Sequence, residues 1–288
     1  MKYVINVLIS FLLLSLITFA LARYGLGNPF AGLGSKGYLN ESQVKELEKA
    51  FGLEGGLSGF LLSFLRGGPP SLLYGKPSLI LFLSYAYPSF TILTLSFLAS
   101  VIVSILIALI TDFKGNKLIS LMAFVPEYFY AALFFVSSWT LGWPNPLPTL
   151  DLSKALAYSL TVFFVECPKL LHGLVGSFED SKKQLEESMM LLKALGLPRV
   201  KQNLAILKFL LPSFASLSLY SFAMLIERSV LIEPFIGFPG MGNLLYTSVV
   251  NADITLAATS FLAIGIIAIT IASLSPFAEK VLDARLRP

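Results

Sequence analysis

The sequence predicts an all-α integral membrane protein that crosses the bilayer six times. Three observations favour this class. Of the 288 residues, 56% are hydrophobic and only 13% are charged, and the mean hydropathy is +0.78, well outside the usual balance of soluble domains. The apolar residues gather in segments of about 20 residues, the length at which a helix crosses a bilayer core of ~30 Å. The charged residues gather mainly between these segments, which places those regions outside the hydrocarbon.

Residues 1–22 are predicted to form the first span, because Val4–Ala22 contains no charge and is long enough to cross a membrane. Lys2 and the small residues at Ala20-Leu21-Ala22 also fit a secretory signal peptide, so that alternative stays open. Residues 23–77 are more polar and are expected to form an extracellular or periplasmic loop, the only place where a small domain outside the membrane is expected.

Residues 78–288 are predicted to contain five more spans. These spans are Ser89–Thr111, Leu118–Trp143, Leu152–Leu171, Ser213–Ile232 and Ile254–Leu274. Pro88 is expected to divide the second apolar region and to leave Ser78–Tyr87 along the outer interface, because proline disfavours helix at the residue before it. Pro168 is expected to kink the fourth span.

The basic residues predict that both termini lie in the cytoplasm. This orientation places the following residues inside: Lys2, Lys114, Lys117, Lys182, Lys183, Lys193, Arg199, Lys201, Lys208, Lys280, Arg285 and Arg287. Both short outer loops hold no basic residue. The polar segment 172–212 is therefore expected on the cytoplasmic side, and the loop 233–253 on the outer side.

The segment 172–212 is predicted to form a helix–turn–helix. Ser181–Leu195 lacks glycine and proline and is rich in helix formers. Its apolar face contains Leu185, Met189 and Leu192. Gly196 is expected to end this helix, because glycine tolerates the left-handed cap, and Pro198 suits the first turn of the next helix. Such an element fits docking on another protein, and the alternative is a linker helix lying on lipid headgroups.

Several classes of site are not expected in this chain. The sequence holds no G-x-x-x-x-G-K-[ST] motif, so it does not bind ATP by that route and is not predicted to be an enzyme. Cys167 is the only cysteine and His172 the only histidine, which excludes a disulfide framework and argues against a Cys/His metal site. The basic residues are not interleaved with aromatics on one face, so no nucleic-acid partner is expected.

The loop 233–253, EPFIGFPGMGNLLYTSVVNAD, combines a glutamate, an aromatic-Pro-Gly-x-Gly run and a downstream aspartate. This block resembles the outer-loop signature of the inner-membrane permeases of ABC importers of the dipeptide and oligopeptide type, specifically the first of the two paired permeases. The segment 172–212 is similar to that family's coupling loop through Lys193-Ala194, Gly196-Leu197 and Leu211-Pro212. Further similarity lies in Phe19–Phe30, Phe51–Gly67, VPEYFYAALFF with LGWPNP, and Asp283–Arg287.

The resemblance implies a type I importer permease fold in the plasma or inner membrane. Two permease subunits would form the pore, two separate ATPase subunits would bind ATP and magnesium, and an extracellular or periplasmic binding protein would deliver the solute. No cofactor is implied in this chain. ATPase contact is implied at Gln184, Glu187, Ser188, Leu191, Leu192, Lys193, Ala194, Gly196 and Leu197. Contact at the outer pore mouth or with the binding protein is implied at Glu233, Phe238, Pro239, Gly240, Met241, Gly242 and Asp253.

Four charged residues, Glu127, Glu166, Glu227 and Arg228, lie in or near predicted spans, where an ionised group is costly unless it is paired or hydrated. Glu127, Glu227 and Arg228 are candidates for the pore lining. The alternative is an internal Glu–Arg pair, or snorkelling near a helix end. Adjacent helical residues point about 100° apart, so Glu227 and Arg228 are expected to pair with other elements rather than with each other.

The sequence therefore predicts a permease subunit of an ATP-driven importer of di- or oligopeptides, surrounded by membrane lipid. Two alternatives stay open. One is the same type of permease carrying oligosaccharides or nickel chelates. The other is an ion-coupled secondary carrier, although no internal repeat typical of such carriers is visible.

Overall fold

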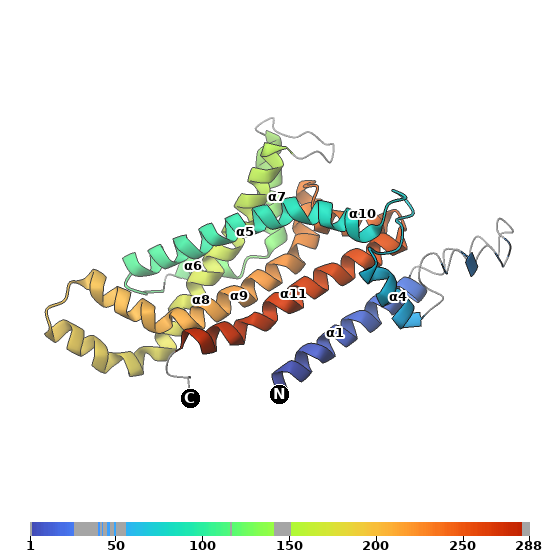
Figure 1. Ribbon diagram of the computed structural model, residues 1–288. Coiled ribbons are helices and arrows are strands. Elements are labelled where there is room, and N and C mark those ends of the chain that lie inside the picture. The colour runs from blue at the N-terminus through green and yellow to red at the C-terminus, as the bar shows by residue number, and fades with distance from the viewer. Residues whose placement is uncertain are drawn as a thin grey trace. The chain divides into compact units, whose positions relative to one another are not determined.

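The computed structural model describes residues 2–25, 56–115, 117–140 and 151–283, together with positions 40, 42, 45, 46 and 49. Within these residues the regular structure is helical, apart from one isolated antiparallel bridge between Pro70 and Pro77 (Figure 1). The predicted all-α class is confirmed for this part of the chain. The similarity noted in LGWPNP and in Ala284–Arg287 lies outside the described residues.

The helices follow one another with few breaks after residue 78. Their bounds are α1 Lys2–Ala20, the π-helical turn η1 Leu21–Gly25, α4 Gly56–Leu65, α5 Ser78–Ile110, α6 Lys117–Ala123, α7 Glu127–Thr140, α8 Leu152–Ala194, α9 Arg199–Ile236, α10 Met241–Val250 and α11 Ile254–Leu282. The chain forms two compact units. Unit 1 comprises Met1–Phe90, Pro146–Leu150 and Ser229–Ile269, and unit 2 comprises Thr91–Asn145, Asp151–Arg228 and Thr270–Pro288. Helices α5, α9 and α11 each contribute residues to both units.

Unit 1 brings the N-terminal helices against the start of α11. The rings of Phe19 and Phe60 lie 6.1 Å apart and join α1 to α4. Gly265 of α11 leaves the space that Leu14 occupies, since a Cβ at that position would overlap the leucine side chain. Close approach at a small residue is the usual way in which apolar helices associate in lipid, where burial of apolar surface between helices brings little gain.

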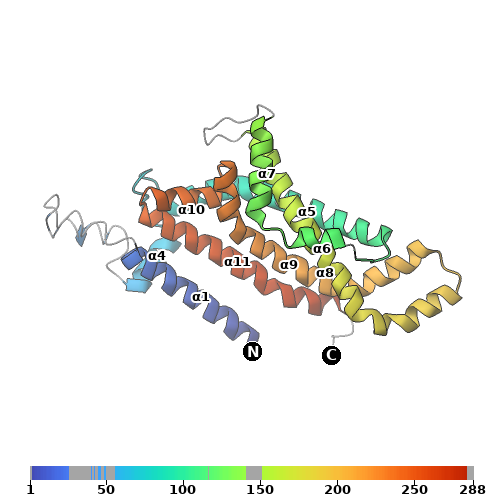
Figure 2. The ribbon, with the colours of Figure 1, turned by 180° about the vertical axis from the view of Figure 1, so that it is seen from behind.

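Unit 2 is held together by helix packing and by hydrogen bonds between polar side chains and neighbouring helices. Both α6 and α7 pack against α8, and α7 lies beside α8 in both ribbon views (Figures 1 and 2). The Ser96 and Ser159 hydroxyls lie 2.8 Å apart, as do those of Ser216 and Ser275. The Asn203 amide, on α9, donates to the Leu109 carbonyl at 2.9 Å at the end of α5. Such bonds satisfy polar groups that have no water partner inside a helix bundle.

Four helices are long and apolar enough to cross a membrane, namely Ile5–Arg23, α5, α9 and α11. The pair α6 and α7 would make a fifth span if it is counted as one. Helix α8 is not among these candidates within the described chain, and its first part carries Lys154, Glu166 and Lys169. A multi-pass membrane protein is therefore supported, while the sixth span and the cytoplasmic position of both termini stay predictions.

The predicted third span, Leu118–Trp143, stays a prediction, but its described residues do not form one straight helix. Helix α6 ends at Ala123, α7 begins at Glu127, and the two are bent by 92°. Pro126 lies in the break, and proline both lacks an N–H and disfavours helix at the residue before it. The break therefore falls at a residue that disfavours a continuous helix, although the apolar sequence continues across it.

The expected division at Pro88 is also wrong, because α5 runs without interruption from Ser78 to Ile110. The neighbouring serine hydroxyls bond to helix carbonyls, Ser84 to Leu81 at 2.7 Å and Ser89 to Tyr85 at 3.3 Å. These bonds go to carbonyls other than that of Ser84, which is the one that Pro88 leaves without its helical N–H partner. Proline inside an apolar helix is tolerated where neighbouring groups satisfy the carbonyl that it frees. Residues 78–87 are thus the first turns of α5 rather than a separate segment, and their position at the outer interface stays a prediction.

Helices α8 and α9 are longer than predicted. The predicted fourth span Leu152–Leu171 and the predicted cytoplasmic helix Ser181–Leu195 belong to one helix of 43 residues, which passes through Pro168. In the same way α9 passes through Pro212 and joins the second helix of the polar segment to the predicted fifth span. The change from polar to apolar residues therefore does not coincide with a helix end.

Candidate functional site

The loop 233–253 of unit 1 contains a carboxylate that caps a helix from a distance. The Glu233 side chain is completely buried, and its Oε2 accepts the N–H groups of Gly242 at 2.7 Å and Asn243 at 3.2 Å. These N–H groups belong to the first turn of α10, where a helix has no carbonyl partners of its own and carries a partial positive charge. Glu233 thus satisfies that helix end and is itself stabilised there.

Two glycines in the same loop allow α9 and α10 to approach closely. We call residues 238–242, FPGMG, the glycine block. A Cβ at Gly240 would overlap the Glu233 carboxylate and the Ser89 hydroxyl, and a Cβ at Gly242 would overlap the backbone of Ser229. The Ser89 hydroxyl oxygen also accepts the N–H of Met241 at 2.9 Å. The spacing of the glycine block therefore has a structural cause, since only glycine fits at these two positions.

Asp253 is a second buried carboxylate that connects distant parts of unit 1. Its Oδ1 accepts the Leu256 N–H at 3.1 Å and caps α11 in the manner of a helix N-cap. Its Oδ2 accepts the Ser71 hydroxyl and the Leu73 N–H, the latter at 3.1 Å. One side chain therefore holds the start of α11 and the turn that precedes α5.

The residues predicted for the outer contact are mostly buried in unit 1. Glu233, Phe238, Gly240, Met241, Gly242 and Asp253 are buried and Pro239 is half-buried. The exposed apolar side chains of α10 are different ones: Tyr246, Val249 and Val250. Contact between this loop and a binding protein stays a prediction. Ser71 and Ser89 were not predicted from the sequence. The only available signal was that each serine directly follows a proline at or inside an apolar segment.

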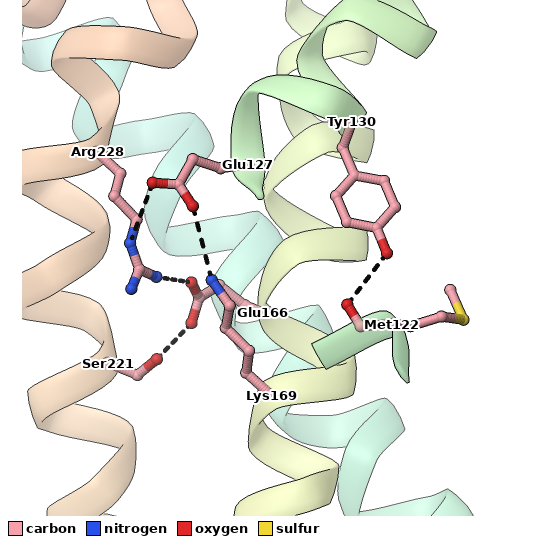
Figure 3. A network of polar contacts seen from close by, with 7 residues as sticks. All are labelled: Met122, Glu127, Tyr130, Glu166, Lys169, Ser221 and Arg228. Atoms are coloured by element: carbon pink, nitrogen blue, oxygen red, sulfur yellow. Dashed lines mark hydrogen bonds and ion pairs between the residues drawn. The ribbon is translucent and has the colours of Figure 1, made fainter. Parts of the chain in front are cut away.

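A group of charged and polar side chains converges in unit 2 from α7, α8 and α9 (Figure 3). We call it the charge cluster: Glu127, Glu166, Lys169, Ser221 and Arg228. Glu166 is completely buried, and Arg228 donates from Nη1 to its Oε1 at 3.0 Å, while the Ser221 hydroxyl donates to its Oε2. This is the internal Glu–Arg pair anticipated as the alternative for Arg228. A buried carboxylate needs such partners, because an unpaired charge is expensive away from water.

The second half of the charge cluster is looser. Glu127 Oε1 lies 3.7 Å from Arg228 Nε, and Glu127 Oε2 lies 4.0 Å from Lys169 Nζ. The side chains of Glu127, Lys169 and Arg228 are 21–23% exposed. Glu127 is also the first residue of α7, where the helix dipole favours a negative charge. The sequence indicated Glu127 and Arg228 but not Lys169 and Ser221, whereas Glu227 is exposed and lies outside the cluster.

The predicted turn at Gly196 is confirmed. Gly196 has a φ of +67°, its N–H donates to the Lys193 carbonyl at 3.0 Å, and the Leu197 N–H donates to the Leu192 carbonyl at 3.3 Å. These two bonds form the Schellman motif that commonly ends a helix at glycine. The Lys201 N–H then donates to the Pro198 carbonyl at 2.9 Å and begins α9.

The outward face of this helix–turn–helix differs from the predicted apolar face. Leu185 is buried and Met189 and Leu192 are half-buried, so that face is turned inward. The exposed apolar residues are Met190, Leu191, Leu195 and Val200, at 62–69% exposure. We call residues 186–200 the tip. Of the predicted ATPase contacts, Leu192 and Leu197 are half-buried and the others are exposed: Gln184, Glu187, Ser188, Leu191, Lys193, Ala194 and Gly196.

These features define a multi-pass membrane protein with a polar helix–turn–helix. Residues 186–288, about the last third of the chain, match the family described as "Binding-protein-dependent transport system inner membrane component". The matched region contains the tip, Arg228 and the glycine block. The match indicates a membrane permease component of an ABC transport system, a family of transport components rather than of enzymes. A comparison with curated proteins gives no match.

Proposed function

We propose that this chain is a pore-forming permease subunit of an ATP-driven importer of short peptides in the plasma or inner membrane. It works with a second, homologous permease subunit, two ATPase subunits that bind ATP and magnesium, and a binding protein outside the cell membrane. The observation that carries this proposal is the exposed apolar tip, which lies inside the region that matches the transport family.

The tip has the composition of a protein-docking surface. Four large apolar side chains are exposed around a fixed turn, and charged residues surround them. Burying one such side chain in a partner's groove is worth about 1.5–3 kcal/mol. A helix that presents apolar anchors to a groove is a common mode of recognition. We infer that Met190, Leu191 and Leu195 enter a groove on an ATPase subunit.

The continuity of α8 and α9 supports a coupling role for the tip. Both helices run without interruption from the tip into the apolar part of the chain. A movement that ATP binding in the partner imposes on the tip therefore tilts both α8 and α9. Rigid-body tilting of helices is an established means of switching access between two sides of a membrane.

The test uses the complete transporter in lipid vesicles. The double substitution Met190→Asp/Leu191→Asp replaces two docking side chains with charges, and we expect recovery of the ATPase with the permease and peptide uptake to fall at least about tenfold. Leu282→Asp is the matched control. Leu282 is 47% exposed near the end of α11, outside the tip, and should leave both readouts unchanged.

Unchanged ATPase recovery in the double variant would refute docking through the tip. The solute is tested separately, by comparing uptake of a tripeptide, an oligosaccharide and a nickel chelate. ATP-dependent uptake of the peptide supports the proposal, whereas uptake of one of the other two solutes alone moves the chain to that alternative. Uptake that follows an ion gradient without ATP would instead indicate a secondary carrier.

A further inference from the structure

The charge cluster has two parts, one joined by direct hydrogen bonds and one joined only by longer ion pairs. Glu166 accepts direct hydrogen bonds from Arg228 and Ser221. Glu127 and Lys169, by contrast, are held only by ion pairs of 3.7–4.0 Å, and neither side chain makes a hydrogen bond within the described part of the chain. Charge-assisted hydrogen bonds between such groups are normally about 2.7–2.9 Å long. Both groups thus retain donors and acceptors for another molecule.

The exposure of these side chains limits what they face. Glu127, Lys169 and Arg228 are each about one-fifth exposed, and they lie on helices α7, α8 and α9 within apolar sequence. A charge facing the hydrocarbon of a membrane is costly, so charged residues in such segments face water or protein. The exposed sides of these three groups therefore face water or a partner protein rather than lipid.

The charges of the cluster also limit which solute fits. Two carboxylates and two cations balance, so the cluster is electrically neutral. A ligand with a single net charge would unbalance it in a medium of low dielectric, where uncompensated charge is expensive. A ligand that carries one ammonium and one carboxylate keeps the balance. Glu127 is placed to accept from the ammonium, and Lys169 is placed to donate to the carboxylate.

We propose that Glu127 and Lys169, supported by Arg228, form a binding site for the two charged end groups of a zwitterionic solute. For the proposed importer this solute is a peptide with free amino and carboxyl ends, so the inference rests on the proposed function. Arg228 stays bonded to Glu166 and positions Glu127. The site lies directly after the 92° bend between α6 and α7, so an occupied site links the start of α7 to α8.

The experiment measures maximal uptake by the complete transporter in vesicles. Four forms of one tripeptide are compared: free ends, acetylated amino end, amidated carboxyl end, and both ends blocked. We expect the wild-type protein to prefer the free peptide. Lys169→Met should lower uptake of the free peptide about tenfold, the effect of losing one hydrogen bond to a charged group, and should abolish the penalty of amidation. Glu127→Gln should abolish the penalty of acetylation instead.

The binding protein is the same in every arm, so a change in the ratio between peptides reports on the permease. Glu227→Gln is the matched control, since Glu227 is exposed, adjacent to Arg228 and outside the cluster, and its ratios should equal those of the wild type. Equal loss for all four peptides in Lys169→Met and Glu127→Gln would mean a purely structural role and would overturn the inference while leaving the proposed function intact. Absence of peptide uptake by the wild type would refute the proposed function, and the inference with it.

Discussion

At the scale of single residues, two buried carboxylates, Glu233 and Asp253, organise the loop 233–253. The sequence identified Glu233, the glycine block and Asp253 by resemblance and assigned them to an outer contact. In the structure the two carboxylates cap α10 and α11. Gly242 makes room for the backbone of α9, and Gly240 makes room for the Glu233 and Ser89 side chains. Ser71 and Ser89 lie far in sequence from their partners Asp253 and Met241, so spacing alone does not predict those two bonds.

Gly242 offers a direct test of this close approach. A Cβ there would meet the Ser229 carbonyl oxygen and carbon, which are backbone atoms and cannot rotate away. Gly242→Ala should therefore destabilise the detergent-purified protein by about 1–3 kcal/mol, the usual cost of overpacking. The measurement is the midpoint of thermal unfolding.

Gly176→Ala is the control for that variant. Gly176 lies inside α8, and an added Cβ would have no atom within 4 Å, so alanine should be neutral or stabilising by up to about 1 kcal/mol. A Gly242→Ala protein that melts at or above the midpoint of Gly176→Ala would show that the loop relaxes around the methyl group.

At the scale of elements, the sequence predicted some helix ends correctly and missed others. Helix α11 begins at Ile254 as predicted, and the helix before Gly196 ends within one residue of its predicted end. The errors at α8 and α9 share one cause. Hydropathy divides a chain by polarity, but a helix continues as long as its backbone bonds continue, so α8 crosses from apolar into charged sequence without interruption.

The break between α6 and α7 is the converse error. Apolar sequence continues through Phe124-Val125-Pro126, so hydropathy gives no warning, while the missing N–H of proline ends the backbone ladder. Yet Pro88, Pro168 and Pro276 lie inside helices. Proline alone therefore does not decide the outcome, and the neighbours that satisfy the freed carbonyl are not visible in the sequence.

The turn at Gly196 yields a prediction about an element. Its φ of +67° suits glycine and, less well, asparagine, and no atom lies within 4 Å of an added Cβ. Gly196→Val should therefore destabilise the native turn by about 1–2 kcal/mol, through backbone strain alone. It should also lower ATP-coupled uptake, because the tip then changes direction. Gly196→Asn should retain most uptake. Equal uptake by the two variants would show that coupling does not depend on the conformation of this turn.

At the scale of the whole molecule, composition alone established the membrane class, and the helices support it. The charge cluster was only partly predictable. Glu127 and Arg228 stood out as charges in apolar sequence, whereas nothing in the sequence distinguished Lys169 beside Pro168. Only the packing of α7 against α8 brings Lys169 to Glu127.

The predicted topology is tested by labelling intact cells. In a Cys167→Ser background, Lys193→Cys should react with a membrane-impermeant maleimide only after the cells are opened, since the tip is predicted to be cytoplasmic. Tyr246→Cys, at a position 52% exposed on α10, should react in intact cells. Reaction of Lys193→Cys from outside would reverse the orientation and remove the tip from the reach of an intracellular ATPase.

Helix α8 has a mechanical consequence. The stretch from Pro168, beside the Glu166–Arg228 pair, to Ala194 at the turn is uninterrupted helix, and at 1.5 Å per residue it measures about 39 Å. A rotation of only about 5° at the proline moves Ala194, at the far end, by about 3 Å, roughly the distance between two atoms in contact. Conversely, a partner that shifts the far end by a few ångströms changes the direction of the helix at the proline by only a few degrees.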